Sequence, residues 1–273
     1  EITTRLVGSE MCIRDRFFDI DGTLLSEVNR NVPESAKRAV AKARANGHLV
    51  FINSGRTYSL IGPIKGLVEV DGYCCGCGTR VIVDDEVLFS FTIPHERGLQ
   101  IKKDILKYNM EGILEGTEHC YFRKAKTRFT QLEQIRENVE RDGHGAPYTW
   151  EDDCYDFDKF CVFADEQSDL AGFSRALGLE YNIIDRGDGF YECVPADYSK
   201  ATAIDVVLEK YGMALEDAYV FGDSTNDLPM FEHAKNCILM GHHDVELEPY
   251  ATFFTKNVED DGIEYAMKKL KLI

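Results

Sequence analysis

Two carboxylates lie one residue apart in the stretch "FFDIDGTLL", residues 17–25. Residues i and i+2 of an extended strand point to the same side, so Asp19 and Asp21 can face one pocket while Ile20 is buried behind them. One carboxylate of such a pair can attack phosphorus, and the other can exchange a proton with the leaving oxygen. Gly22 permits a sharp turn after the pair, and the Thr23 hydroxyl can hold that turn in place.

Further polar groups follow other apolar runs of the chain, at 54–56, 200 and 223–227. In a parallel α/β sheet, ligands gather at the carboxyl ends of the strands. We therefore expect these groups to converge with the acidic pair at one edge of a sheet: Ser54, Gly55 and Arg56, then Lys200 at a helix start, then Asp223, Ser224, Asn226 and Asp227.

Such a set of side chains predicts a site for a metal and a phosphate. Converging carboxylates repel one another unless a hard cation lies between them, and Mg²⁺ prefers oxygen ligands together with a substrate phosphate. Lys200 can supply a point charge to that phosphate, while the Ser54 hydroxyl and nearby backbone N–H groups such as that of Gly55 can donate hydrogen bonds.

The elements that must position these groups follow an α/β pattern at both ends of the chain. Residues 33–47 predict a helix, and apolar runs at 48–53 and 67–72 predict buried parallel strands. Alternation returns after residue 195, with a helix at 199–212 and a strand at 218–223. These patterns predict a Rossmann-like parallel sheet with helices on both faces.

The middle of the chain has a different pattern. Residues 80–94 predict a hairpin, and amphipathic helices then alternate with strands in an α+β order. We therefore expect a core domain in two segments, 1–82 and 192–273, interrupted by an inserted α+β cap domain at 83–191.

The stretches "DIDGT", "NSGR", "YSKA" and "GDSTND" resemble, in this order, the four motifs of the haloacid dehalogenase-like superfamily, in its Cof-type branch of sugar-phosphate and related phosphatases. The resemblance covers residues 17–273. It implies that Asp19 is the nucleophile and a Mg²⁺ ligand, and that Asp21 is the general acid and base and ligates Mg²⁺ through its carbonyl. It further implies that Ser54 and Lys200 hold the phosphate, that Asp223 is the third ligand, and that Asn226 and Asp227 orient the site.

The resemblance implies a Mg²⁺-dependent phosphatase that hydrolyses small phosphomonoesters, such as sugar phosphates, through an aspartyl-phosphate. The alternatives are a phosphomutase of the same fold and a non-catalytic domain that accepts or binds phosphate. The cap would close over the site and contact the leaving group. The sequence offers several candidates for that contact without selecting among them: His119, Tyr121, Arg123, Lys124, Arg128, Tyr148 and Trp150.

Composition limits the range of partners. The net charge of −17 disfavours nucleic acid and anionic membrane surfaces, which leaves a small phosphorylated metabolite as the expected partner. Nine cysteines without regular spacing, and no apolar run near the roughly 18 residues of a membrane span, indicate a reduced, cytoplasmic protein. We expect a monomer or a weak homo-oligomer.

The start of the chain does not fit this pattern. A strand buried on both faces should carry four to six apolar residues before Asp19, yet only Phe17 and Phe18 qualify, behind three charged residues at 14–16. Residues 6–16, "LVGSEMCIRDR", look like a translated adapter oligonucleotide of the kind used in sequencing libraries. Our hypothesis is that residues 1–16 are non-native, which sequencing of the source gene would test.

Overall fold

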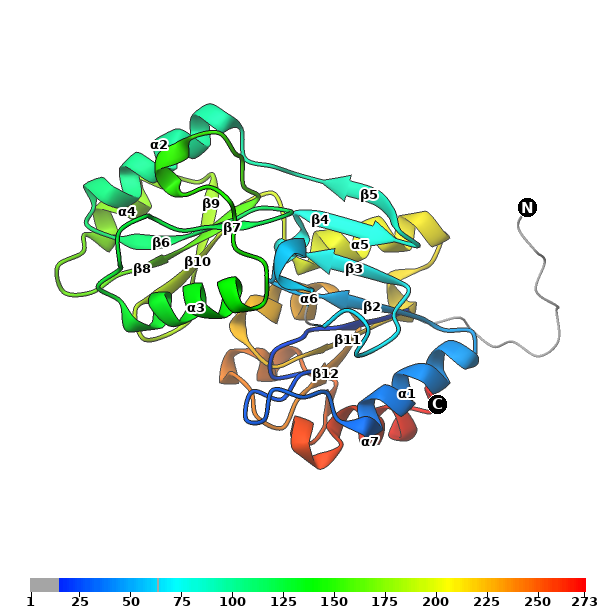
Figure 1. Cartoon of the computed structure of the whole chain (residues 1–273). Helices are drawn as coiled ribbons and strands as arrows, with labels where there is room; N and C mark the ends of the chain where they lie inside the picture. Colours follow the sequence, from blue (N-terminus) through cyan, green and yellow to red (C-terminus); the bar gives the residue numbers. More distant parts are fainter. Residues whose placement is uncertain (1–14, 63) are drawn as a thin grey trace.

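The chain forms two β-sheets with helices packed on them, one sheet for each kind of pattern in the sequence (Figure 1). The computed structural model describes residues 15–62 and 64–273. The larger sheet has the order β13-β12-β11-β1-β2-β3-β4-β5. Its strands are β1 (Asp15–Phe18), β2 (Leu49–Asn53), β3 (Gly72–Cys75), β4 (Arg80–Val83), β5 (Glu86–Ser90), β11 (Ala218–Gly222), β12 (Asn236–Leu239) and β13 (Phe253–Phe254).

Neighbouring strands are parallel from β13 to β3, and the β3-β4-β5 end is antiparallel. Helices cover both faces of this sheet. One face carries α1 (Glu34–Ala45) and α7 (Gly262–Lys269), and the other carries α5 (Lys200–Tyr211) and α6 (Leu228–His233). The predicted α/β core, with a Rossmann-like parallel sheet between two helical layers, is confirmed.

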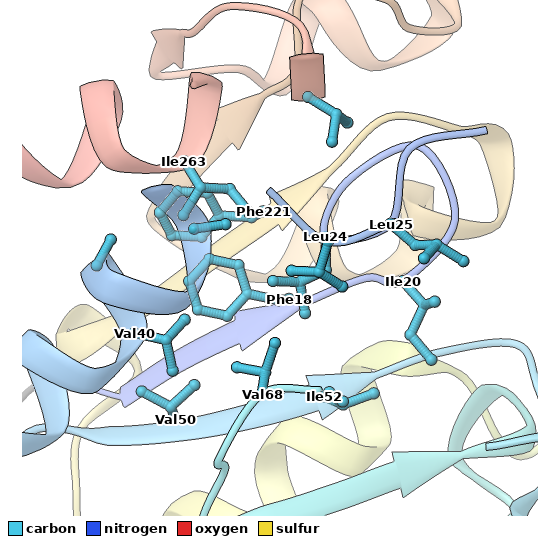
Figure 2. Close-up of a cluster of buried hydrophobic side chains, with 14 of the residues drawn as sticks. Phe18, Ile20, Leu24, Leu25, Val40, Val50, Ile52, Val68, Phe221 and Ile263 are labelled. Carbon is cyan, nitrogen blue, oxygen red and sulfur yellow. The ribbon is translucent and has the colours of Figure 1, made fainter. Parts of the chain in front are cut away.

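Alternating side chains of the central strands build the two halves of the core. Phe18 and Phe221 lie on the α1 and α7 face, where their rings stack with centroids 4.4 Å apart (Figure 2). Phe17 lies on the opposite face and stacks on Phe51 with centroids 5.2 Å apart. Each such ring contributes about 1.5–3 kcal/mol to stability through burial. These two layers fix β1 at the centre of the sheet, and with it the residues that follow β1.

The smaller sheet is antiparallel and forms the cap. Its order is β7-β6-β8-β10-β9. The strands are β6 (Glu111–Glu115), β7 (Cys120–Tyr121), β8 (Lys159–Phe163), β9 (Tyr181–Asp185) and β10 (Phe190–Pro195). Helices α2 (His95–Lys107) and α4 (Leu170–Leu177) pack on one face, and α3 (Thr130–Arg141) packs on the other.

Sheet membership extends past the predicted boundaries of the insert. Strand β4 pairs with β3 on one side and with β5 on the other, so β5 belongs to the larger sheet. That sheet therefore continues to Ser90. Strand β10 pairs with β8 and β9 as far as Pro195. The small sheet with its helices therefore occupies the segment between Ser90 and Pro195. The sequence predicted the segment 83–191.

The third strand of the core begins later in the chain than the apolar run at 67–72 had predicted. Leu67 is 38% exposed, and β3 begins only at Gly72. The side chain of Asp71 explains the shift, because it accepts hydrogen bonds from the backbone N–H of Val50 (2.8 Å) and from Arg44. A side chain thus satisfies the backbone group of β2 that a longer strand would have bonded.

Strand β1 begins with two charged residues that are fully buried, Asp15 and Arg16. Arg16 donates a hydrogen bond to the Leu272 carbonyl (3.3 Å). The hypothesis about residues 1–16 otherwise concerns the segment 1–14, which lies outside the described residues. Across 15–62 and 64–273, no helix is both long enough and apolar enough to cross a membrane.

Candidate active site

The loop after β1 carries the acidic pair and turns sharply at Gly22. Asp19 is 3% exposed, and Ile20 is fully buried behind it. Gly22 has a φ of +80°, and a Cβ at this position would lie 2.3 Å from Asp223 Oδ2. Only glycine fits such a backbone and such a close approach. The turn therefore brings the β1 loop against the end of β11, as the two strand ends were predicted to meet.

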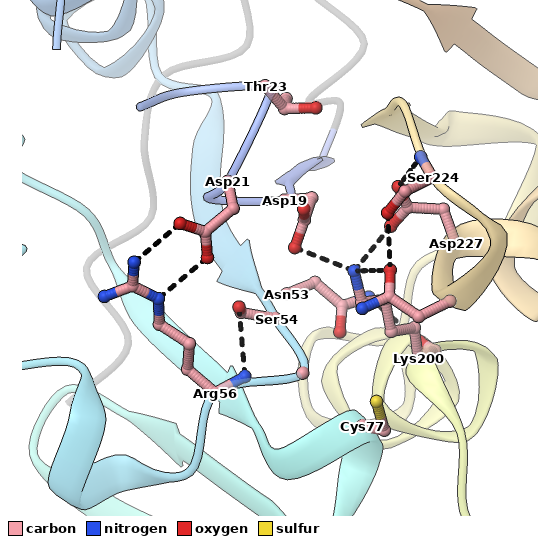
Figure 3. A network of polar contacts seen from close by, with 12 residues as sticks. Asp19, Asp21, Thr23, Asn53, Ser54, Arg56, Cys77, Lys200, Ser224 and Asp227 are labelled. Carbon is pink, nitrogen blue, oxygen red and sulfur yellow. Dashed lines mark hydrogen bonds and ion pairs between the residues drawn. The ribbon is translucent and has the colours of Figure 1, made fainter. Parts of the chain in front are cut away.

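Lys200 joins three segments of the site (Figure 3). It lies at the start of α5 and is fully buried. Its ammonium donates hydrogen bonds to Asp19 Oδ1 (2.7 Å), to Asn226 Oδ1 (3.1 Å) and to Asp227 Oδ1. Burial alone would lower the pKa of Lys200, but the carboxylates of Asp19 and Asp227 outweigh it and hold the pKa above its ordinary value.

Three carboxylates converge beside Lys200. One oxygen each of Asp19, Asp223 and Asp227 lies within 4.8 Å of the others. Burial raises the pKa of Asp19 to about 7, against the opposing effect of Lys200. Burial, followed by the charges of Asp227 and Asp19, raises the pKa of Asp223 to about 9. When its three carboxyl groups are ionised, the cluster carries more negative charge than Lys200 neutralises, which is the chemistry of a cation site.

Asp223 and Asp227 are held by their own loop and by Thr23. The Thr23 hydroxyl donates to Asp223 Oδ1 (2.7 Å). Asp227 Oδ2 accepts the backbone N–H groups of Asp223 (2.9 Å) and Ser224 (3.1 Å). These bonds fix the "GDSTND" loop, so its carboxylates stay in the pocket without a ligand to hold them.

The "NSGR" loop after β2 forms the neighbouring wall. Ser54 is 1% exposed, and its Oγ accepts the backbone N–H of Arg56 (3.2 Å). A Cβ on Gly55 would lie 2.8 Å from Glu192 Oε1 and 3.0 Å from Asn226 Nδ2, so the position has no room for a side chain. Ser54, Gly55 and Asn226 line a pocket of about 180 Å³ together with Asp19.

Asp21 does not join the carboxylate cluster with its side chain. It forms a two-pronged ion pair with Arg56, with distances of 2.8 Å from Nε and 2.6 Å from Nη2 (Figure 3). Burial raises the pKa of Asp21, but the Arg56 guanidinium outweighs it, so the pKa lies below its ordinary value. The sequence placed Arg56 at this strand end without giving it a role, and the pairing is what that reasoning missed.

The cap contributes charged residues that the sequence did not single out. Lys159 is 2% exposed and donates to the Gly55 carbonyl (3.0 Å) and to Glu192. Glu115 lies 3.5 Å from the same ammonium. Arg186 reaches across from the cap to Ser224 Oγ (3.3 Å). A charge at an inward position of an otherwise apolar strand, such as "DKFCVFA" or "GFYECVP", was the available signal.

The seven cap residues that the sequence offered as candidates are not among the described residues that line the pocket around Asp19. Trp150 is buried and donates to the Tyr121 carbonyl (2.9 Å), and Arg128 is bound to Asp165 and Glu111. Of the core residues with a predicted role, five line that pocket: Asp19, Asp21, Ser54, Gly55 and Asn226. The carboxylate oxygens that lie close together are those of Asp19, Asp223 and Asp227.

Comparison with known proteins now defines the class. The sequence profile of the haloacid dehalogenase-like hydrolases matches residues 16–267, so the chain belongs to this family. It is a hydrolase of the phosphatase kind. It is similar to the "Putative phosphatase YkrA" of Bacillus subtilis, with 30% identity over 94% of this chain and 97% of that protein.

One further relative and two solved structures extend the comparison. The pyridoxal phosphate phosphatase YbhA of Escherichia coli is 22% identical over 96% of this chain and 97% of its own length. In fold, the chain resembles the subclass IIB sugar phosphatase BT4131, with a TM-score of 0.80 and 24% identity over 95% of this chain and 100% of that structure. The chain also resembles BT1666 of Bacteroides thetaiotaomicron, with a TM-score of 0.81 and 24% identity over 99% of this chain and 100% of that structure. The expected fold, with its cap, is thus that of known solved structures.

Proposed function

We propose that this chain is a Mg²⁺-dependent phosphatase that hydrolyses small phosphomonoesters through an aspartyl-phosphate on Asp19. The observation that carries the proposal is the convergence of Asp19, Asp223 and Asp227 within 4.8 Å beside the buried ammonium of Lys200. Family membership supports the hydrolytic chemistry. The expected substrates are sugar phosphates or similar metabolites of the cytoplasm, handled by a monomer or a weak homo-oligomer.

The donor set fits Mg²⁺. Three carboxylates face one lysine, and burial together with the neighbouring carboxylates raises the pKa values of Asp19 and Asp223, an effect that a divalent cation would oppose. Asp19 and Asp223 would hold the ion together with the carbonyl of Asp21, and Asp227 lies beside them. When bound, the ion would supply charge neutralisation for the phosphoryl oxygens during the displacement.

The residues of this chain would divide the remaining work. Lys200 holds Asp19 Oδ1, which leaves the second carboxylate oxygen to attack phosphorus. Ser54, the backbone N–H of Gly55 and the amide of Asn226 would bind the phosphoryl oxygens. Asp21 would protonate the leaving oxygen and later accept a proton from the hydrolytic water. Because Arg56 now holds Asp21 as a carboxylate, Asp21 must leave this pair and take up a proton from water before it can act as the acid.

The test is phosphate release from a panel of phosphomonoesters, including p-nitrophenyl phosphate, with Mg²⁺ and after chelation. The protein should be active only with the ion, and the Asp19→Asn variant should be inactive with every ester. Turnover that survives chelation, or that persists in the variant, would overturn the mechanism. Detection of a bisphosphorylated product would favour the mutase alternative instead.

A further inference from the structure

A cleft between cap and core opens directly from the phosphate pocket. Its volume is about 670 Å³, whereas the pocket around Asp19 holds about 180 Å³. Both are lined by Asp21, Arg56, Leu60, Glu115 and Phe190, so the two spaces are continuous. A pocket of the smaller size suits the phosphoryl group, and the rest of a substrate must therefore occupy an adjoining space.

Eight of the sixteen residues that line the cleft are apolar, and they come from both the core and the cap. The core supplies three aliphatic side chains and the cap supplies three more: Leu25, Ile64 and Leu67, then Ile113, Ile135 and Val139. At the junction with the phosphate pocket lie Leu60 from the core and Phe190 from the cap. The Phe190 ring is stacked on Phe163 with centroids 4.9 Å apart, which holds it in place. Hydroxyl groups placed directly against these apolar side chains would lose water, whereas an aromatic surface there would gain by burial.

Polar groups lie in the same cleft beside the apolar walls. Asn138, Arg141, Asp142 and His144 come from α3 and the segment after it, and the other charged lining residues are Asp21, Arg30, Arg56 and Glu115. They offer hydrogen-bond donors and acceptors to ring heteroatoms or substituents. A heterocycle matches this combination of apolar walls and local polar groups better than a plain hydrocarbon does.

A second space also adjoins the site, but its lining has a different character. It has about 690 Å³ and shares Asp21, Asp223 and Arg186 with the catalytic region. Six of its lining residues are acidic: Asp21, Glu27, Asp185, Asp223, Asp244 and Glu246. An apolar ring gains little in such a space, whereas a polyhydroxylated or cationic group would be accommodated there.

We propose that the cleft between α3 and the segments 56–62 and 64–67 binds the leaving group of the substrate, and that this group carries an aromatic heterocycle. The inference rests on the proposed function, since it assigns the substrate class of the same site. Asp21, the intended proton donor to the leaving oxygen, lies on the wall where the cleft meets the phosphate pocket. Asp21 lines the acidic space as well, so the apolar side chains of the cleft are what favour it for a ring-bearing leaving group.

The test compares esters that differ only in the ring. Riboflavin 5′-phosphate and ribitol 5-phosphate share one alkyl phosphate, and 2-phenylethyl phosphate and ethyl phosphate form a smaller pair. We expect kcat/KM to favour the ring-bearing member of each pair by about 10- to 100-fold in the unaltered chain. Equal efficiencies, or a preference for the ring-free members, would overturn the proposal.

Variants locate the preference. Leu60→Asn and Ile135→Asn should bring each pair to within about threefold by selectively lowering kcat/KM for the ring-bearing ester. Leu106→Asn is the matched control, because Leu106 is 45% exposed on α2 and lies outside the residues that line the cleft. Thermal melting verifies that all three variants are folded. A loss of the same size on both members of a pair would contradict the assignment.

A binding measurement separates this inference from the proposed function. In the Asp19→Asn variant, quenching of flavin fluorescence reports binding of riboflavin 5′-phosphate, and competition reports ribitol 5-phosphate. Preferential flavin binding without turnover of any ester by the unaltered chain would support the ligand class while refuting the proposed function. Turnover of both esters with equal efficiency and equal affinity would refute the ligand class alone.

Discussion

The two ends of β1 each bury a carboxyl group, and they differ in what surrounds it. Asp15 is fully buried and Asp19 is 3% exposed, and burial raises the pKa of each to about 7. Asp19 receives a hydrogen bond of 2.7 Å from the Lys200 ammonium. The side-chain oxygens of Asp15 receive no hydrogen bond from residues 15–62 or 64–273.

Asp19 and Asp15 differ in the charged groups that surround them. Around Asp15 the charge of Arg16 lowers the pKa, while Asp217 and Asp71 raise it, and burial dominates. Around Asp19 a lysine, two further carboxylates and a small pocket converge. A raised pKa therefore does not by itself mark a functional group, and the converging partners do.

The largest expected effect contrasts matched substitutions at the two ends. Asp19→Asn should lower turnover by at least about 10³-fold, because it removes the proposed nucleophile. Asp15→Asn should leave turnover within about twofold, since Asp15 lies at the opposite end of the strand. Steady-state assays with p-nitrophenyl phosphate measure both turnover rates. Comparable losses of turnover in the two variants would contradict the expected difference between Asp19 and Asp15.

Removing the ammonium of Lys200 should leave Asp19 as a buried carboxyl group without a hydrogen bond from a cation in the described part of the chain, as Asp15 is. Lys200→Met leaves the buried carboxylates without their cation, so the free energy of unfolding should fall by about 3–5 kcal/mol. Urea titration measures the change. Added Mg²⁺ should recover part of the loss in the variant, and unchanged stability in the absence of the ion would show that Lys200 does not balance this cluster.

At the start of β1, Asp15 should make the free energy of unfolding depend on pH. Because the pKa of Asp15 is about 7 in the folded chain against an ordinary value of 3.8, ionisation destabilises the fold. The penalty is absent below pH 3.8, grows as the pH rises toward 7, and reaches about 4 kcal/mol above that. Asp15→Asn should therefore stabilise the protein at pH 8, with a gain that shrinks toward pH 4. Urea titrations across this range check it, and a gain independent of pH would contradict it.

The smallest effect is expected where a hydroxyl holds a carboxylate. Thr23→Val removes the hydrogen bond to Asp223 and should cost about 1.5–3 kcal/mol of unfolding free energy. Thr117→Val is the cap control, because the Thr117 hydroxyl donates in the same way to Asp158 (2.7 Å). Both should lose stability, but only Thr23→Val should raise the Mg²⁺ concentration for half-maximal turnover. The same shift in both variants would mean that Thr23 has no special link to the ion.

Much of the core was accessible from the sequence. The helix at 33–47 and the segments around 48–53, 199–212 and 218–223 appear as α1, β2, α5 and β11. Their periodicity is a property of neighbouring residues, which is why it predicted them. The apolar run at 67–72 misled the same reasoning, because the side chain of Asp71 satisfied a backbone group that a strand would have used.

By itself, the sequence determined the layered α/β core, the inserted cap and the convergence of Asp19, Lys200 and Asp223, because strand ends of a parallel sheet share one edge. Only the tertiary structure decided that Asp21 pairs with Arg56, that Lys159 and Glu192 cover the pocket, and that an apolar cleft opens beside it. The partners Lys159 and Gly55 are 104 residues apart, and their contact depends on how the cap is seated on the core. Local patterns record which face of an element is buried, but the side chain met across an interface depends on the orientation of both parts.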